Sequence, residues 1–289
     1  MKKLLDFLAS GKILYDEPSL FSGLDESQIL KRMTFLVGLV ALCLPIILAI
    51  GAGWNTQDGT CFRTSISHFY YAPFLGPVFV GSLVFIGGFL IAYTGEHPVE
   101  DKWSSVAGIG ACFVALFPTV GSGCETSKVM VARILVEYTQ ESGPGVGPEI
   151  IALPGGDYFE LFEKAPALHV IAAAIVFSYL AIYCLIVMKR VIPDRHQIES
   201  KMIPSKRRRN ILYSLCGITI LTCIAILGAE SFSILRIEHW DDFKLTFVFE
   251  TIALWAFGIA WFAKARVFRR LNDPAIPKTP SESPKLRTV

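Results

Sequence analysis

The stretch MTFLVGLVALCLPIILAIGAG, residues 33–53, contains no charged side chain. A helix needs roughly 20 mostly apolar residues to cross the hydrocarbon core of a bilayer. With 21 residues, this stretch is long enough to span a membrane. The strands of a membrane barrel are shorter and alternate apolar with polar residues, so the continuous apolar run favours a helix.

Five similar stretches follow along the chain, and only the last of them contains a charged residue, Glu250. The chain of 289 residues is 53% hydrophobic and 18% charged, with a mean hydropathy of +0.50. Because soluble domains carry about 25% charged residues, this composition argues against a soluble enzyme. We predict an all-α, polytopic membrane protein with six transmembrane helices in one bundle, over residues 33–53, 74–94, 104–120, 167–188, 210–229 and 245–263.

Lysine and arginine are distributed unequally between the two sides of this predicted bundle. With the N-terminus in the cytoplasm, 21 of the 27 basic residues lie on the cytoplasmic side. Cytoplasmic loops carry the basic excess in membrane proteins, so we expect both termini in the cytoplasm and the protein in the inner, or plasma, membrane. The chain then divides into a cytoplasmic lead-in (1–32), a transmembrane domain (33–264) and a disordered cytoplasmic tail rich in proline (265–289).

The basic run Lys206–Arg209 lies beside the fifth predicted helix. Juxtamembrane basic clusters orient helices and attract anionic lipid headgroups. We therefore expect the cytoplasmic basic segments to contact membrane lipids, and we expect no nucleic acid partner. The sequence also contains no Gly-rich phosphate loop or dinucleotide fingerprint.

The outer loops hold two of the seven cysteines, Cys61 and Cys124. The outer side is oxidising, and a disulfide between these two residues would join the first two outer loops. The alternative is a pair of free thiols. The second outer loop, 121–166, is too long for a plain connection and is expected to form a lid over the helix ends. Within it, the spacing of apolar residues over 126–141 predicts a helix along the membrane surface.

Small residues recur at packing intervals in two of the predicted helices. Ser104, Gly108 and Cys112 are four residues apart, and Gly81 and Gly88 share one face of the second span. Such residues let helices approach closely in lipid. Pro45 and Pro118 are expected to kink their helices.

Glu250 lies about five residues inside the sixth span from its outer end. A carboxylate at that depth is costly, so it should face the bundle or a wet cavity and have a partner. Polar groups from other outer helix ends would surround it in a compact bundle. The predicted ligand-binding pocket consists of Glu250, His169, Ser67, His68, Tyr70 and Tyr71. The alternative is that Glu250 is a hydrogen-bonded packing residue.

Three histidines on the same side offer a metal site as an alternative. His68, His169 and His239, together with carboxylates, would suit zinc. No pair of histidines has the spacing of a helical metal motif, so we expect no cofactor, with zinc as the alternative. Ser67 is poorly placed to act as a nucleophile with His68 as its base, because neighbouring residues on a helix do not face each other.

Short motifs along the chain resemble those of known membrane proteins. They are Ser65–Tyr71, Val78–Gly81, Phe85–Gly87, Ala115–Thr119, Leu168 with His169, and Ala253–Gly258. In these motifs the chain resembles a group of uncharacterised bacterial six-span membrane proteins and, more distantly, the Frag/DRAM/Sfk family. The resemblance covers most of residues 55–265 and implies a six-helix bundle in a plasma or inner membrane. It implies no particular activity.

Three functions are consistent with these features. The leading hypothesis is a non-enzymatic protein that binds a lipid or small amphiphile in the outer-facing pocket, as a sensor, transporter component or accessory factor. The alternative is a metal-dependent intramembrane lipid hydrolase with Glu250 as general base. The third is a pore-forming effector, which would have to be an oligomer because the spans contain no ladder of ionisable groups.

Overall fold

The computed structural model describes residues 26–54, 62–72, 74–95, 98–119, 121–122, 128–131, 134–139, 149–152, 164–192, 196–198 and 201–273. Each stretch of sequence predicted to cross the membrane forms a long helix over most of its length. These helices are α2 (Glu26–Trp54), α3 (Leu75–Ala92), α4 (Pro98–Leu116), α5 (Ala165–Ile182), α7 (Pro204–Ser231) and α8 (Leu245–Lys264). The prediction of a helical bundle is therefore confirmed.

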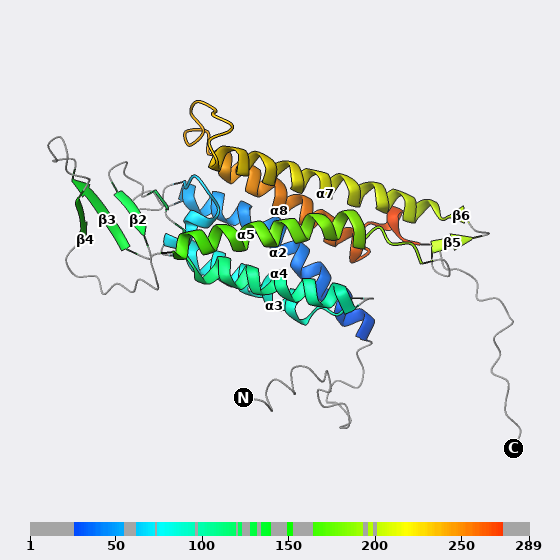
Figure 1. The fold of residues 1–289 in the computed structure, drawn as a ribbon. Helices are drawn as coiled ribbons and strands as arrows, with labels where there is room; N and C mark the ends of the chain where they lie inside the picture. The colour runs from blue at the N-terminus through cyan, green and yellow to red at the C-terminus, as the bar shows by residue number, and fades with distance from the viewer. Residues whose placement is uncertain are drawn as a thin grey trace, which may run out of the picture.

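The helices form a closed ring in which every helix packs against its neighbours in the sequence. α2 contacts α3, α3 contacts α4, α4 contacts α5, α5 contacts α7, α7 contacts α8, and α8 returns to α2. Figure 1 shows the helices side by side along one direction, with the strands β2–β4 beyond one end and β5–β6 beyond the other. We name the end with β2–β4 the outer end and the other the inner end, following the predicted orientation.

Five of these helices are long and apolar enough to cross a membrane: α2, α3, α5 with its continuation, α7 and α8. The chain is thus a multi-pass membrane protein. α4 differs because Glu100, Asp101 and Lys102 occupy its first turns. It ends at Leu116, so Pro118 follows the helix and does not kink it. α5 continues into a π-helical turn, η2 (Tyr183–Val187).

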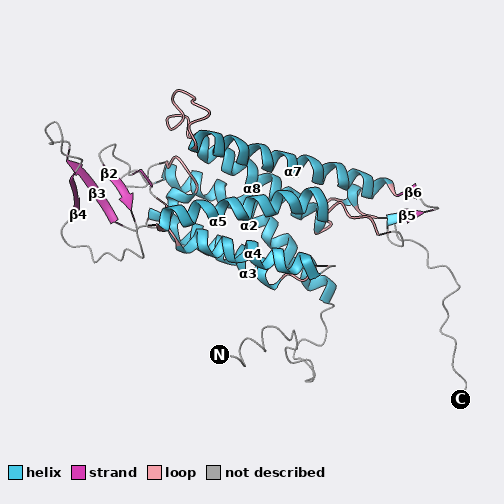
Figure 2. Cartoon of the chain, in the orientation of Figure 1, coloured by secondary structure: helices cyan, strands magenta, loops and turns pink. Residues whose placement is uncertain are grey.

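The second outer loop contains strands where the sequence predicted a surface helix. β1 (Gly121–Ser122), β2 (Lys128–Val131), β3 (Ile134–Thr139) and β4 (Glu149–Ala152) form an antiparallel sheet in that order (Figure 2). The helix predicted over 126–141 is therefore wrong. Valine, isoleucine, threonine and tyrosine are common in this stretch and favour strands. In the inner loop, β5 (Gln197–Ile198) pairs with β6 (Lys201–Met202). The predicted Cys61–Cys124 disulfide lies outside the described residues.

The interior of the ring is filled by two apolar clusters, one nearer each end. The inner cluster includes Tyr93, Tyr183 and Trp261. The outer cluster surrounds the 3₁₀ turn η1 (Ser67–Tyr71), whose Phe69 is completely buried. η1 therefore closes the outer end of the bundle by inserting an aromatic ring.

Residues 265–273, which follow α8, adopt a defined structure, whereas the sequence predicted disorder from residue 265. It includes the short helix η3 (Arg269–Leu271). Asp273 contacts Arg209 of α7 and Arg266, which fastens the segment to the inner end of the bundle.

Close packing of α3 against α4 depends on two glycines. A Cβ atom at Gly108 would lie 2.6 Å from the carbonyl oxygen of Gly87, and one at Gly87 would lie 2.8 Å from that of Gly108. Ser104, on the same face of α4, donates a hydrogen bond of 2.7 Å to the Leu90 carbonyl. The packing face predicted on the third span is confirmed. Gly81 and Gly88 of the second span do not pack against it, because a Cβ atom at either position would meet open space.

We expect Gly108→Ala to destabilise the protein by about 1–3 kcal/mol, because the new methyl group must push two backbones apart. Gly88→Ala is the matched control, since its methyl group meets nothing within 4 Å and alanine favours a helix by about 0.5–1 kcal/mol. Thermal unfolding in detergent measures both. A melting temperature for Gly108→Ala equal to that of Gly88→Ala would show that α3 and α4 are not held by this contact.

Candidate functional site

Glu250 of α8 binds the turn that leads into η1. Its carboxylate accepts hydrogen bonds from Ser65 Oγ, at 2.9 and 3.0 Å, and from the Ile66 amide, at 2.6 Å. The Phe247 amide, one turn earlier on α8, donates to the Thr64 carbonyl at 2.9 Å. α8 therefore holds the 62–72 segment against the outer end of the bundle through both backbone and side chain.

His169 of α5 holds the next residue of the same segment. Its Nδ1 lies 2.7 Å from the Phe117 carbonyl oxygen, and its Nε2 lies 3.0 Å from Ser67 Oγ. Because a carbonyl can only accept, Nδ1 carries the proton, and Nε2 of the neutral ring accepts from the Ser67 hydroxyl. His169 is 4% exposed. The Ser67 amide also donates to Ser65 Oγ at 3.1 Å, so Glu250, Ser65, Ser67 and His169 form one hydrogen-bonded network.

The other predicted site residues lie at the edge of this region or away from it. His68 contacts Thr64 through Nδ1, at 2.9 Å, and Tyr71 donates to the Thr119 carbonyl at 2.5 Å. Tyr70 stacks edge-on against Tyr71. His239 lies in the exposed α7–α8 loop and pairs with Asp242. Within the described part of the chain, no three His, Cys, Asp or Glu side chains are placed to hold a metal, so the structure does not bring the proposed zinc ligands together.

The cavity beneath the outer polar region is small. It has a volume of about 60 Å³, and its walls are apolar except for Ser67 and Glu250. Since a water molecule takes up about 30 Å³ of liquid, the cavity holds about two waters. A lipid chain does not fit there without a rearrangement of the outer cluster.

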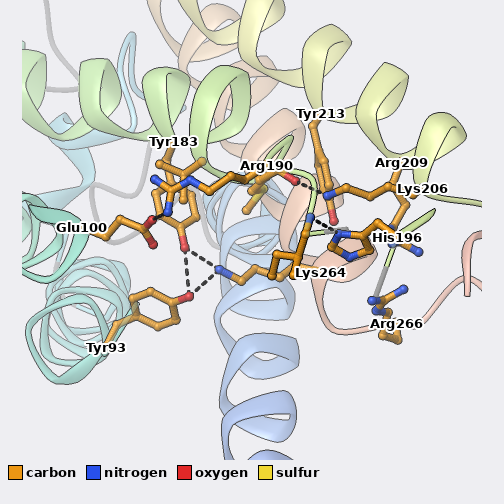
Figure 3. Close-up of a pocket in the computed structure, with 13 residues that line it drawn as sticks. Tyr93, Glu100, Tyr183, Arg190, His196, Lys206, Arg209, Tyr213, Lys264 and Arg266 are labelled. Atoms are coloured by element: carbon orange, nitrogen blue, oxygen red, sulfur yellow. Dashed lines mark hydrogen bonds and ion pairs between the residues drawn. The ribbon is translucent and has the colours of Figure 1, made fainter. Parts of the chain in front are cut away.

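A second polar region lies at the inner end, and we name it the inner pocket (Figure 3). It has a volume of about 170 Å³. Its lining comes from the end of α3, the start of α4, η2 and the segment after it, the start of α7, and the end of α8. Five cationic side chains and one carboxylate line it: Arg190, Lys206, Arg209, Lys264, Arg266 and Glu100.

Lys264 lies in a cage of aromatic rings. Its ammonium group donates to Tyr93 Oη at 2.6 Å and to Tyr183 Oη, and it lies 4.5–5.0 Å from the ring centres of Tyr93, Tyr183 and Trp261. Tyr183 in turn donates to Tyr93 Oη at 2.9 Å. Among the described residues, no carboxylate lies within 4.0 Å of Lys264. Neutral phenol oxygens and aromatic ring faces therefore stabilise the positive charge of Lys264.

Asp273 contributes a second carboxylate close to the inner pocket. It accepts from Arg209 at 2.7 and 2.9 Å and from Ser205 at 2.7 Å, and it pairs with Arg266 at 2.7 Å. Burial alone would raise the pKa of Asp273, but the hydrogen bonds from Arg209, Ser205 and Arg266 outweigh it and hold the pKa well below its usual range. The carboxylate is therefore charged throughout the physiological range.

His196 is buried in this region. Its Nδ1 accepts a hydrogen bond of 2.9 Å from the Ile192 amide, so the neutral ring carries its proton on Nε2. Burial, and then the charges of Lys206, Arg209 and Arg266, lower its pKa, which Asp273 only partly opposes. At neutral pH it is an uncharged donor.

An apolar groove between α4 and α5 opens at the inner pocket. It has a volume of about 610 Å³, and its walls include Trp103 and Val106 of α4 and Ile175 and Ile182 of α5. These four side chains are between 41% and 59% exposed. The groove and the inner pocket share the lining residues Glu100, Tyr183, Val187 and Arg190.

The inner pocket was missed in the sequence because its cations are dispersed along the chain. The whole run Lys206–Arg209 was expected to contact lipid headgroups, whereas Lys206 is 4% and Arg209 2% exposed. Arg207 and Arg208 between them remain exposed. Helical periodicity over this run was a signal that two of the four side chains face the bundle.

We expect Glu250→Ala to loosen the 62–72 segment, because the Ile66 amide and the Ser65 hydroxyl lose their acceptor, at a cost of about 1–3 kcal/mol. Hydrogen exchange at the Ile66 amide measures this as faster exchange. Glu250→Gln retains a carbonyl acceptor and is the control, expected to keep most of the protection. Unchanged exchange in Glu250→Ala would mean that Glu250 does not hold this segment.

Comparison with known proteins finds no match for the chain among protein-family models, curated protein sequences or solved structures. The resemblance to the Frag/DRAM/Sfk family therefore stays a prediction, and functional assignment depends on the geometry of the two polar regions.

Proposed function

We propose that the chain is a six-span protein of the inner, or plasma, membrane, with both termini in the cytoplasm, that binds a membrane lipid in the α4–α5 groove. The observation that carries the proposal is the continuity of this apolar groove with a cationic pocket. The groove suits a hydrocarbon chain, and the pocket suits a polar headgroup. Membrane lipids are thus the expected partners, in the role of a sensor, transporter component or accessory factor.

Packing supports α4 as the sixth spanning helix. It runs along α3, held by the contact between Gly87 and Gly108. Its charged residues, Glu100, Asp101 and Lys102, are confined to the inner end, where the inner pocket gathers the charges of other helices. From Trp103 to Leu116 the helix has no charge. α4 can therefore cross the apolar layer beside α3, and the groove faces lipid.

The predicted lipid site at the outer end receives less support than this inner one. The polar atoms of Glu250, Ser65, Ser67 and His169 already bond one another. The cavity beneath them has room for about two waters. The groove offers about ten times that volume, so we place the lipid there. A pore is also disfavoured within one chain, because apolar clusters fill the ring.

The first test uses a substitution that fills the groove with a large side chain. Ala174→Trp places a large ring among its walls, and overpacking of about 1–3 kcal/mol predicts about tenfold less lipid retained per chain. Ala167→Trp is the matched control, because Ala167 is exposed on α5 but does not line the groove. Mass spectrometry of lipids extracted from purified protein gives the ratio. Equal lipid in both variants would contradict the proposal.

Hydrolysis of a lipid ester is a second candidate function, favoured by the pairing of Ser67 with His169. A histidine that accepts from a serine hydroxyl while its other nitrogen donates to a carbonyl is arranged as a general base for a nucleophile. This arrangement needs no metal ligands, unlike the hydrolase predicted from the sequence. It ranks second because the cavity at Ser67 is small and apolar.

A fluorophosphonate probe tests this candidate, since it labels activated serines. If Ser67 is a nucleophile, wild-type protein in detergent becomes labelled, whereas Ser67→Ala and His169→Gln do not. Ser65→Ala serves as the control, because Ser65 binds Glu250 and not the histidine. Absence of labelling in wild type would leave Ser67 and His169 as a structural hydrogen bond.

A further inference from the structure

We propose that the α7–α8 loop, residues 232–244, lies along the outer surface of the bilayer and inserts its apolar side chains among the lipid headgroups. Its partner is thus the lipid surface itself, at a place separate from the α4–α5 groove, and the contact does not depend on a lipid in that groove. Side-chain exposure, backbone conformation and the position of the two helices support this assignment.

Large apolar side chains are exposed along the whole loop. Phe232 is 80%, Ile234 79% and Phe243 67% exposed, and Ile237 is exposed as well. Within the loop, Trp240 alone is buried. Phenylalanine and isoleucine gain free energy when they leave water, and several of them exposed together mark a surface that meets a partner. An environment that accepts apolar side chains is therefore expected to cover the loop.

Hydrogen bonds fix the backbone of the loop at both of its ends. After α7, the Ile234 amide donates to the Ala229 carbonyl at 2.8 Å, and before α8, the Leu245 amide donates to the Trp240 carbonyl at 3.1 Å. The indole N–H of Trp240 donates to Thr246 Oγ1 at 2.8 Å, which fastens the loop to the first turn of α8. The loop therefore presents its apolar side chains from a defined backbone.

Three residues of the loop have a left-handed backbone conformation. The φ angle is 56° at Ser233, 62° at His239 and 52° at Lys244. Residues other than glycine adopt this conformation only where the surrounding structure imposes it, and they are concentrated at functional sites. The shape of the loop is thus preformed, with Phe232 and Phe243 on its outside.

The length of α7 places the start of the loop in the headgroup layer. From Asn210 to Ala229 the helix has 20 residues without a charge, which is about 30 Å at 1.5 Å per residue and equals the hydrocarbon thickness of a bilayer. Figure 1 shows the loop leaving the ends of α7 and α8 sideways, away from α3 and α4, instead of continuing in the direction of the helices. A loop in this position lies over lipid.

The loop also continues the lipid-facing side of α7. Ile211, Leu215, Ile218 and Leu221 are exposed on this helix at intervals of three and four residues, so they share one face. Phe232 follows Leu221 by 11 residues, which is about three helical turns. Its ring is therefore on the side of α7 that faces lipid, at the outer end of that side.

Charged side chains lie among the apolar ones, which favours a lipid surface over a protein partner. Arg236 and Glu238 flank Ile237 in the sequence, and His239 pairs with Asp242 at 2.8 Å in an exposed position. The headgroup layer accepts apolar and aromatic side chains while it keeps neighbouring charges hydrated. The core of a protein interface, in contrast, is depleted of charged residues.

Photo-crosslinking identifies what covers the loop. The photoreactive amino acid p-benzoylphenylalanine replaces Phe232 or Phe243 in the full chain, which is reconstituted in vesicles of phosphatidylcholine. Mass spectrometry after illumination identifies the adducts. Ile234, which is equally exposed, is a further position for the probe if one of these variants does not fold.

The same probe at Asp242 is the matched control, because this side chain lies in the same loop and is 74% exposed, but is charged and expected to face water. We expect about tenfold more phosphatidylcholine adduct at Phe232 and Phe243 than at Asp242, as the gain from removing an aromatic ring from water predicts. Because the probe is identical in every variant, the difference in yield reports the position in the loop.

Lipid adducts enriched at both phenylalanine positions support a loop that lies on the bilayer. Cross-links to a second copy of the chain in place of lipid would overturn the proposal, since they would assign the loop to a protein interface. Equal lipid yields at Phe232, Phe243 and Asp242 would overturn it as well, because the loop would then stand in water. Ala174→Trp alters a different lipid contact, so the groove and the loop can succeed or fail separately.

Discussion

α8 carries one charge near each end, Glu250 at the outer end and Lys264 at the inner end, and most of the polar structure is arranged around these two side chains. Glu250 and Lys264 are 14 residues apart, which is about 21 Å along a helix. Neither can face hydrocarbon without a large cost. At the outer end the 62–72 segment folds inward to donate hydrogen bonds to Glu250. At the inner end three aromatic rings surround Lys264.

The partners of Glu250 and those of Lys264 differ in a way that bears on function. The carboxylate at the outer end receives three hydrogen bonds from a segment of this chain, which leaves little to attract a ligand. The ammonium at the inner end receives only neutral partners among the described residues, and it is surrounded by further cations. Saturated networks rigidify a protein, whereas uncompensated charge in a pocket is a feature of binding sites. This contrast favours the inner end as the site of the proposed ligand.

Apolar run length and the position of Glu250 were sufficient to predict the helices and the outer polar region from sequence. Glu250, Ser67 and His169 could be assigned to one region because each lies near the outer end of its helix, but the direct partners of Glu250, Ser65 and the Ile66 amide, were not identified. The strands at Lys128–Val131 and Ile134–Thr139 were missed, since their apolar residues also satisfy a helical period. Gly87 was missed for a similar reason, because sequence cannot tell which small residue of a helix meets a neighbour.

The inner pocket shows why a basic juxtamembrane run has two separable roles. Arg207 and Arg208 face outward, where they can orient the helix and attract anionic headgroups. Lys206 and Arg209, on the opposite side of the turn, point into the bundle. A signal for membrane orientation needs only positive charge at the cytoplasmic end of the helix, and either face of the helix can carry that charge. Burial of two of these charges costs free energy that topology does not require. Arg209 recovers part of this cost through its ion pair with Asp273, and Lys206 donates a hydrogen bond to the Met188 carbonyl.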